Sequence, residues 1–529
     1  MKKSYILFIS LLALVFSGCS KDYLNTAPTS DIASTAIFEN TNNMKMAVNG
    51  LNKLFCKQWL GTQGWNGQGT VMLYHGEYPG DELTVYLTGW TNTICGKYHT
   101  SDNSIYDYGP WHIYYMVIGN ANSILAGLET ATESTPGDKA FIEAQARTYR
   151  AYCYYYLLQL YAKRWIDSND GAAPGVVLRL DESTGDLALS TQKQCYDQIY
   201  DDLNIAINKF KESKQDRTNK YEMGIDVAYA LYSRVALARE DWDTAYTMAS
   251  VILDENKYPL MSVAEYNSGF CTANKEWIWY LVGLETETLY YYSFAAYVAY
   301  NAQASQVRSY PKCISKQVFV QMRDNDIRKK LFLDPGDMSY TTSSGKADPT
   351  KNKELYDYGY KYASMDGRKG FPVNTFSIFA YMQFKFGTDI QVGITDVPLF
   401  RTSEVLLNRA EAAYKLGKTT EAQKDLNTLN NYNAKEGKAD LTMARIPDYK
   451  CTLTGDELYN EIKLYRRIEL WGEGFNWFDL KRWGDTIERK NFKNGGSFFD
   501  AVAITIGPKD MNEWTWVIPK KEKDYNHAL

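Results

Sequence analysis

The chain has 529 residues, 45% of them hydrophobic, enough for one large or two ordinary domains around a substantial core. Its 58 basic and 63 acidic side chains give a formal net charge of −5 and a pI near 5.7, which argues against a nucleic-acid-binding protein. Aromatic residues make up 15% of the chain, an excess that suits both a packed core and a surface that recognises flat, amphipathic partners.

The first predicted element is a secretory signal. Two lysines precede a mostly apolar run at residues 5–16, which is shorter than the roughly 20 residues that a membrane span needs. Cys19 directly follows a Ser-Gly pair and resembles the lipidated cysteine of bacterial lipoproteins, with Phe16 in place of the usual leucine. We therefore expect residues 1–18 to be removed and Cys19 to anchor the protein to a membrane surface outside the cytoplasm.

Residues 59–110 are predicted to form a first irregular excursion. Residues 61–103 are rich in Gly, Asn and Thr and contain Trp65 and Trp90. Loops that a rigid scaffold positions are where binding residues usually lie.

Helical periodicity predicts a scaffold at about residues 139–254 and 402–432. Long helices are expected at 139–162 and 191–210, followed by helical hairpins at 228–253 and 403–432. Both hairpins carry alanines that let two helices approach closely, as in tetratricopeptide units. In the second hairpin, Gly417 is expected to end one helix and Thr419 or Thr420 to cap the next.

The chain between the hairpins reads differently, and about residues 270–400 are predicted to form a second excursion. Residues 276–284 form a strand-like apolar run, and residues 376–386 show the period-two alternation of a strand. Residues 334–366 contain turn sequences and are expected to be loop.

The cysteines and histidines indicate neither a disulfide framework nor a zinc site. Setting Cys19 aside leaves seven cysteines without paired spacing, and these are expected to be small buried hydrophobes. Four histidines without ligand spacing exclude a zinc motif, so no cofactor is expected. Scattered carboxylates leave a structural calcium open, which the sequence does not indicate.

Six segments in order resemble the SusD/RagB family of outer-membrane lipoproteins. They are the mature start at 21–24, the helix at 111–122, the Arg-Ala-Tyr helix at 144–161, the segments at 398–412 and 466–483, and the end near Asn526. The segments at 398–412 and 466–483 are the most specific. The resemblance covers nearly the whole chain, and it assigns residues 455–529 to a C-terminal family signature.

The resemblance implies a mainly α fold: one SusD-like domain at residues 19–529, in which tetratricopeptide-like hairpins carry long irregular excursions and a few short strands. It also implies a surface-exposed lipoprotein of the outer membrane that captures an oligosaccharide, or less often a peptide, for a SusC-like TonB-dependent transporter. Members of the family are not enzymes.

The C-terminal signature also invites an enzymatic interpretation. Glu469, Glu473 and Asp479 lie close together in sequence, and paired carboxylates are what glycoside hydrolysis needs. Charged groups placed among tryptophans are more often buried ion pairs, and this is the interpretation we favour.

The candidate ligand-binding residues are aromatic side chains in the two excursions together with polar neighbours, because sugars offer C–H faces for stacking and hydroxyls for amides and charged groups. Asp81 and Glu82 resemble an acidic pair that SusD-like proteins often carry. The predicted set is Trp65, Asn66, Asp81, Glu82, Trp90, Asn92, Tyr98, Tyr106, Tyr290, Tyr291, Tyr292, Tyr297 and Arg308.

The sequence therefore predicts a lipid-anchored glycan-binding protein that works by stacking and hydrogen bonding without covalent chemistry. A helical glycoside hydrolase, a protein-interaction scaffold and a peptide-binding member of the same family remain as alternatives.

Overall fold

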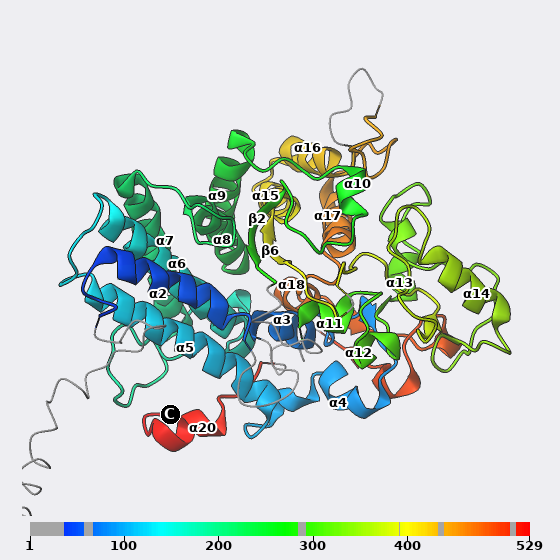
Figure 1. The fold of residues 1–529 in the computed structure, drawn as a ribbon, viewed down its shortest axis with the longest axis horizontal. Coiled ribbons are helices and arrows are strands. Elements are labelled where there is room, and N and C mark those ends of the chain that lie inside the picture. The colour runs from blue at the N-terminus through cyan, green and yellow to red at the C-terminus, as the bar shows by residue number, and fades with distance from the viewer. Residues whose placement is uncertain (1–35, 58–66, 284–292, 391, 432–438, 508–514) are drawn as a thin grey trace, which may run out of the picture.

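The computed structural model describes residues 36–57, 67–283, 293–390, 392–431, 439–507 and 515–529. In this part of the chain helices dominate, and the strands form only two-stranded pairs. The long helices gather on one side of the molecule, while short helices and loops occupy the other (Figure 1). The predicted mainly α fold is confirmed.

The first half of the scaffold is a row of long helices: α2 (Thr41–Leu54), α5 (Ile105–Gly127), α6 (Asp138–Tyr161), α7 (Gln192–Ser213), α8 (Ile225–Ala238) and α9 (Trp242–Glu255). Helix α6 is buried on nearly all sides because it contacts α2, α5, α7 and α8. Its Arg150 forms a buried ion pair with Asp202 of α7. The helices predicted at 139–162 and 191–210 are confirmed.

The second hairpin consists of α15 (Thr402–Lys415) and α16 (Thr419–Asn430), and α15 packs against both α8 and α9. Ala236, Ala245 and Ala412, all fully buried, form a small cluster with Leu237 where these helices meet. Two hairpins that are far apart in sequence thus share one alanine-lined interface, as tetratricopeptide-like packing requires.

The turn between α15 and α16 is only partly as expected. Gly417 has a φ of +73°, the left-handed conformation that ends a helix. The predicted threonine cap is wrong, because α16 already begins at Thr419. Lys418 occupies the N-cap position and makes no side-chain capping bond.

The chain enters and leaves the second excursion through one strand pair. Strand β2 (Trp277–Leu281) runs antiparallel to β6 (Val397–Arg401). The strand predicted at 276–284 is therefore confirmed in a shorter form. The other pairs, each of two residues per strand, are β1 (Leu83–Thr84) with β3 (Cys313–Ile314), β4 (Lys346–Ala347) with β5 (Ile378–Phe379), and β7 (Ile487–Glu488) with β8 (Thr505–Ile506).

The strand predicted at residues 376–386 is wrong. Only Ile378–Phe379 is a strand. Residues at both odd and even positions of the segment are buried, including Tyr381, Met382 and Phe384. The segment passes through the interior, so alternation in its sequence does not mark an outer face.

Residues 67–104 also differ from the expected loop, because they contain α3 (Gly67–Val71), η2 (Met72–Glu77), η3 (Thr88–Trp90), α4 (Thr91–Ile94) and η4 (Lys97–Thr100). The glycines here serve close packing. A Cβ atom on Gly69 would lie 3.0 Å from Cβ of Phe294, and one on Gly76 would lie 2.3 Å from the carbonyl oxygen of Gly474.

Two further helices belong to the C-terminal segment. These are α17 (Gly455–Glu469) and α18 (Asn476–Trp483), which precede the terminal α20 (Lys520–Tyr525). The others are η5 (Trp165–Asp167), α10 (Val263–Tyr266), α11 (Phe294–Val298), α12 (Ser305–Arg308), α13 (Lys316–Phe319), η6 (Lys329–Leu331), α14 (Lys353–Tyr362), η7 (Phe492–Asn494) and η8 (Asp500–Val502). The loop predicted at residues 334–366 is therefore wrong in part, because this segment contains β4 and the ten-residue helix α14.

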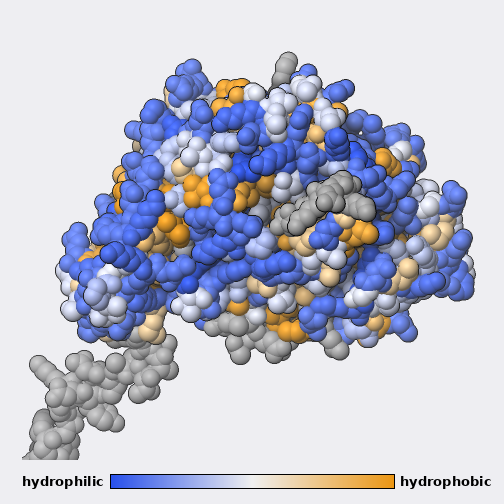
Figure 2. Space-filling view, turned by 90° about the horizontal axis from the view of Figure 1, so that it is seen from above, coloured by the Kyte–Doolittle hydropathy of each residue, from blue (hydrophilic) through white to orange (hydrophobic). Residues whose placement is uncertain are grey.

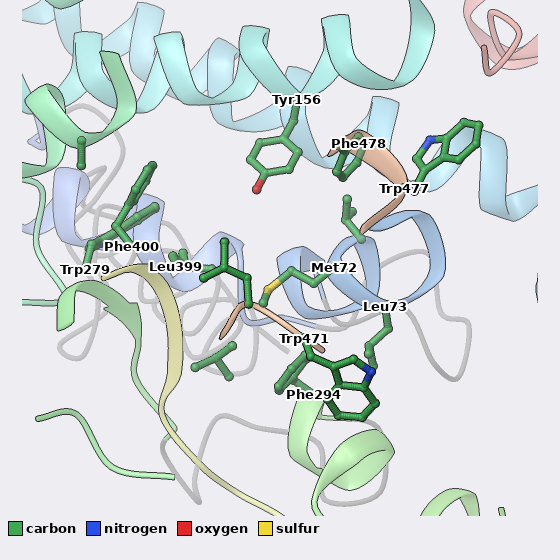
Figure 3. Packing of buried hydrophobic residues seen from close by; sticks show 14 of the residues in the cluster. Met72, Leu73, Tyr156, Trp279, Phe294, Leu399, Phe400, Trp471, Trp477 and Phe478 are labelled. Carbon is green, nitrogen blue, oxygen red and sulfur yellow. The ribbon is translucent and has the colours of Figure 1, made fainter. Parts of the chain in front are cut away.

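One continuous core joins the scaffold to the excursions. Tyr156 of α6 meets Phe478 of α18, while Trp471 and Phe294 lie near the helix that carries Met72 and Leu73 (Figure 3). The outer surface, seen from above, is mainly hydrophilic, with hydrophobic residues in separate areas (Figure 2). Among the described residues, no helix has both the length and the apolar character of a membrane span.

Candidate functional site

Five aromatic side chains from both excursions form a cluster, which we call the aromatic cluster: Tyr74, Tyr78, Trp90, Tyr106 and Tyr297. Tyr74 lies at its centre, with its ring centroid 5.3 Å from that of Trp90, 5.5 Å from Tyr106 and 5.9 Å from Tyr297. Tyr78 stacks on the same ring at 5.5 Å. These are distances at which aromatic pairs attract one another.

The members of the aromatic cluster come from four elements of the fold, with Tyr74 and Tyr78 both held by η2. Tyr74 lies within η2 and Tyr78 directly follows it, while Trp90 ends η3. Tyr106 lies in the first turn of α5, where Ser104 caps the helix and the ring of His75 contacts the Tyr106 carbonyl oxygen at 2.8 Å. Tyr297 lies in α11, whose N-terminus is capped by Ser293.

The aromatic cluster has a buried base and a partly exposed edge. Tyr74, Tyr78 and Tyr297 are buried, whereas Trp90 and Tyr106 are partly exposed and their centroids lie 6.4 Å apart. Burial raises the pKa values of Tyr74 and Tyr78 well above their usual range, so both keep their hydroxyl protons. The base of the aromatic cluster is therefore uncharged.

A buried lysine lies behind this cluster. The Nζ atom of Lys312 is 5.9 Å from the Tyr297 centroid and donates to the carbonyl oxygens of Gln306 and Tyr310. Burial lowers the pKa of Lys312 to about 7. The lysine thus joins the backbone at Gln306 and Tyr310 close to the Tyr297 ring.

The structure describes eight of the thirteen candidate ligand-binding residues. Asn92 is exposed on α4, next to Trp90, and Arg308 is partly exposed at the end of α12. Tyr98 belongs to η4, and its side chain lies outside the described part of the chain. Also outside it lie Trp65, Asn66, Tyr290, Tyr291 and Tyr292, together with the lipidation residue Cys19.

The residues that flank 58–66 in the first excursion lie close to those that flank 284–292 in the second. The amide of Gln68 donates to the Phe55 carbonyl, and Gly69 lies against Phe294. Residues flanking 58–66 and 284–292 line one apolar pocket of about 30 Å³, which includes Phe55, Cys56, Leu281, Val282 and Phe294. The chain next to residues 58–66 thus lies against the chain next to residues 284–292.

Asp81 and Glu82 are placed in the interior. Arg467 of α17 contacts the carboxylates of both residues, and Trp471 Nε1 donates to the carbonyl oxygen of Glu82 at 3.0 Å. Burial raises the pKa of Glu82, Glu77 adds to the rise, and Arg467 opposes it. The acidic pair therefore holds the first excursion to the C-terminal segment and does not lie on the aromatic edge.

The three carboxylates that suggested catalysis are buried and paired. Arg401 contacts Glu469 at 2.7 Å and Glu473 at 2.7 Å, while Arg466 contacts Asp479 at 2.6 Å. Burial alone would raise the pKa of Glu469, but Arg401 and Arg328 hold it well below its usual range. These carboxylates have the arrangement of a structural ion network.

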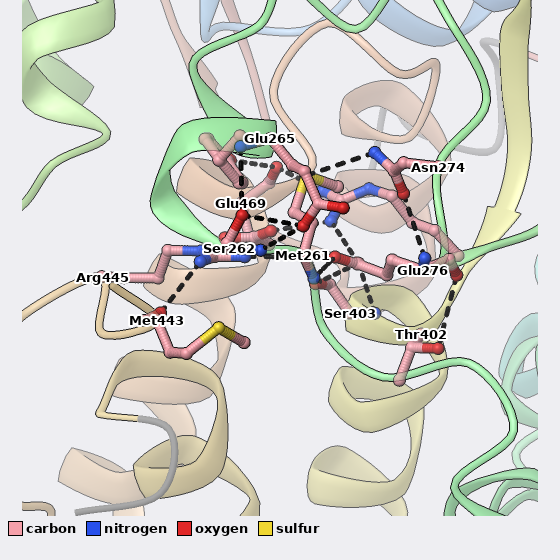
Figure 4. A network of polar contacts seen from close by, with 12 residues as sticks. Met261, Ser262, Glu265, Asn274, Glu276, Thr402, Ser403, Met443, Arg445 and Glu469 are labelled. Atoms are coloured by element: carbon pink, nitrogen blue, oxygen red, sulfur yellow. Dashed lines mark hydrogen bonds and ion pairs between the residues drawn. The ribbon is translucent and has the colours of Figure 1, made fainter. Parts of the chain in front are cut away.

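The same network continues toward β2 and α15. Glu276 accepts hydrogen bonds from Ser403 and from the amide of Met261, and it pairs with Arg401 at 3.0 Å (Figure 4). The guanidinium of Arg445 lies on its other side, 4.0 Å away. The network therefore joins four segments of the chain at the centre of the fold.

Sequence reasoning missed Tyr74 and Tyr78, the base of the aromatic cluster. The two tyrosines are four residues apart and follow Met72 and Leu73. This spacing places the two side chains on one helical face and could have indicated a helix here. The surrounding glycines favoured a loop instead.

Comparison with known proteins agrees with this architecture. The model described as "SusD family" matches residues 242–528, more than half of the chain, and the model "Starch-binding associating with outer membrane" matches residues 74–237. The chain therefore belongs to the SusD family.

Individual relatives are distant but cover most of the chain. A SusD-like protein of Bacteroides ovatus is 22% identical over 91% of this chain and 82% of its own length, and one of Formosa agariphila is 26% identical over 91% of both. The crystal structure of a SusD-like carbohydrate binding protein from Bacteroides vulgatus is similar with a TM-score of 0.71 at 20% identity, over 93% of this chain and 97% of that one. A SusD superfamily protein from Bacteroides thetaiotaomicron gives 0.70 at 21% identity, over 92% and 98%.

Proposed function

We propose that this protein binds a carbohydrate at the cell surface and passes it to a TonB-dependent outer-membrane transporter. Membership of the SusD family supports carbohydrate binding and association with the outer membrane. The observation that carries the proposal is the aromatic cluster, which presents the edges of Trp90 and Tyr106 on a rigid, buried tyrosine base.

Capture works by stacking and hydrogen bonding. The partly exposed rings offer apolar faces to the C–H groups of a sugar, and Asn92 offers an amide next to Trp90. Because the cluster is preassembled, little side-chain entropy is lost on binding. Micromolar to millimolar affinity, about 4–8 kcal/mol, retains the ligand and still lets it leave for the transporter.

Binding proceeds without catalysis in this proposal. The carboxylates that suggested a hydrolase, Glu469, Glu473 and Asp479, are paired with arginine and lysine side chains in the interior. A general acid needs a raised pKa and access to the scissile bond, and the pKa of Glu469 is shifted in the opposite direction.

The remaining parts of the proposal concern location and partner. The signal at residues 1–18 and the cysteine at position 19 support a lipid anchor on the outer membrane, exposed to the medium. Pairing with a SusC-like transporter follows from the family resemblance. Co-purification of the lipidated protein with an outer-membrane transporter from detergent extracts tests both, and a Cys19→Ser variant is the control for the anchor.

The direct test is a glycan screen on the protein beginning at Lys21, read by calorimetry or affinity electrophoresis, with reducing-end release assayed in the same samples. Saturable binding without release is the expected result. Release of reducing ends would show an enzyme and overturn the proposal. Binding of peptides, with no binding of any plant or host glycan, would favour the peptide-binding alternative.

A further inference from the structure

Cys271 and Lys369, 98 residues apart in sequence, bring a thiol and an amine into contact away from the aromatic edge. The Nζ atom of Lys369 lies 3.1 Å from the Sγ atom of Cys271. One carboxylate oxygen of Asp389 accepts a hydrogen bond from the same Nζ, and the other lies 3.6 Å from Sγ. Three loops therefore place a nucleophilic sulfur, a nitrogen and a proton acceptor together.

Small solutes can reach this group. Cys271 is 9% exposed, whereas the Lys369 side chain is 27% and the Asp389 side chain 68% exposed. Cys195 gives the contrast within the chain, since it is fully buried, although the thiols of both cysteines donate to a backbone carbonyl oxygen. Cysteine oxidation follows exposure and the groups around the sulfur, which favours Cys271 over Cys195.

We propose that Cys271 and Lys369 close a reversible covalent sulfur–nitrogen crosslink when the protein meets a peroxide. In the first step the sulfur attacks one peroxide oxygen, the O–O bond breaks, and a sulfenic acid and water form. The sulfur is oxidised by two electrons and the peroxide is reduced. In the second step Asp389 takes one proton from the ammonium of Lys369, the freed lone pair of Nζ attacks the sulfenic sulfur, the S–O bond breaks, and the departing hydroxide takes a second proton from the nitrogen and leaves as water.

The protons of the second step are accounted for by the same group. The ammonium of Lys369 loses two protons when the sulfenamide forms, one to the departing hydroxide and one to the carboxylate of Asp389. Burial opposes the charge on Lys369, but Asp389 and Cys271 together raise its pKa, so the nitrogen begins protonated and hydrogen-bonded to its acceptor. Sulfenic acids condense with backbone nitrogens to give sulfenamides, and the proposed step is the same condensation at a lysine nitrogen.

The crosslink would fasten loops that support α11. The amide of Lys369 donates to the Tyr300 hydroxyl, and the side-chain amide of Asn301 donates to the carbonyl oxygen of Thr388. Closing a loop of nearly 100 residues in the unfolded chain is expected to raise the Tm of a protein of this size by about 4 °C. The inference does not depend on the proposed carbohydrate binding.

The experiment treats the protein beginning at Lys21 with hydrogen peroxide and maps peptides by mass spectrometry. The expected product is a peptide pair joined through residues 271 and 369, about 2 Da lighter than the two reduced peptides together, which dithiothreitol separates again. The Lys369→Arg variant keeps the charge and is expected to stop at a sulfenic acid that dimedone traps. In the Asp389→Asn variant the crosslink is expected to form more slowly, because the proton acceptor is lost.

Two outcomes would overturn the inference. One is a peroxide-treated wild type that carries dimedone on Cys271 in the same yield as Lys369→Arg. The other is a peroxide-treated wild type that gives no peptide pair joined through residues 271 and 369. Circular dichroism of each variant before oxidation establishes that it is folded, and Cys195 serves as the unmodified internal cysteine.

Discussion

Trp90 and Tyr106 are the side chains whose removal tests the site most directly. Trp90→Ala or Tyr106→Ala removes one stacking face, so glycan affinity is expected to fall by about 1 kcal/mol or more, about fivefold or more. Calorimetry with the glycan found in the screen measures this. Tyr246→Ala, on α9, changes an aromatic side chain of the scaffold and should leave affinity unchanged. Equal affinity in all three variants would remove the aromatic edge from the site.

Arg401 is the residue on which the buried ion network depends. Arg401→Met leaves Glu276, Glu469 and Glu473 without their shared cation. The free energy of unfolding is therefore expected to fall by about 3–5 kcal/mol. Urea unfolding measures the difference. Lys193→Met breaks the exposed pair with Asp197 and is expected to cost no more than about 1 kcal/mol. Similar losses in both variants would contradict the central role of the network.

Glu77 makes the stability depend on pH. One of its carboxylate oxygens accepts from the amides of Gly474 and Phe475, and burial raises its pKa from 4.5 to about 8. The folded state therefore holds a proton that the unfolded state has already released, so stability is complete at low pH and falls as the pH rises from about 4.5 to 8.

Glu77→Gln keeps the accepting oxygen and removes the titration. Relative to this variant, the wild type is expected to lose up to about 1.4 kcal/mol of unfolding free energy per pH unit within that range. Urea unfolding at pH 5.5 and at pH 8.5 checks the sign. A constant difference between the two proteins would show that Glu77 does not titrate there.

At the scale of elements, the close approach of η2 to the C-terminal segment sets the position of Tyr74. Gly474 has a φ of +90°, and a Cβ atom on it would lie 2.8 Å from Cβ of Met72. Gly474→Ala must therefore both strain the backbone and displace the helix that carries Tyr74.

Gly495 provides the control, because it has a φ of +81° and no atom within 4 Å of a built Cβ. Gly495→Ala is expected to cost about 1 kcal/mol from strain alone, whereas Gly474→Ala should lower both stability and glycan affinity further. Thermal unfolding and calorimetry measure the two effects. Equal behaviour of the variants would mean that the contact with Met72 has no influence on the site.

The elements also show what sequence reasoning can and cannot provide. Periodicity located α6, α7 and the two hairpins, because each buries a continuous face against a neighbour. Residues 67–77 were misread because their glycines, which normally mark loops, here permit contact with Phe294 and Gly474. Asp81 and Glu82 were predicted to bind ligand because they resemble an acidic pair of SusD-like proteins. Nothing in the local sequence reveals their partner Arg467, which lies 386 and 385 residues away.

For the whole molecule, the contacts between its two halves predict that neither half folds alone. The two matching family models divide the chain near residue 240, yet Arg234 of α8 forms a buried bidentate pair with Glu404 of α15. The alanine cluster crosses the same boundary, as does the contact between Gly76 and Gly474. A fragment ending there exposes the apolar face of α8 and leaves Arg234 unpaired.

Residues 36–239, expressed alone, are therefore expected to lack a cooperative unfolding transition, whereas the chain beginning at Lys21 should unfold in one transition in urea. Arg234→Met in the full chain is the matched test of the buried pair, and it should lower the midpoint of that transition by leaving Glu404 unpaired. A fragment that unfolds cooperatively and resists protease would show two independent domains. Because the aromatic cluster draws Trp90 from one half and Tyr297 from the other, such a result would also place the site at an interface between them.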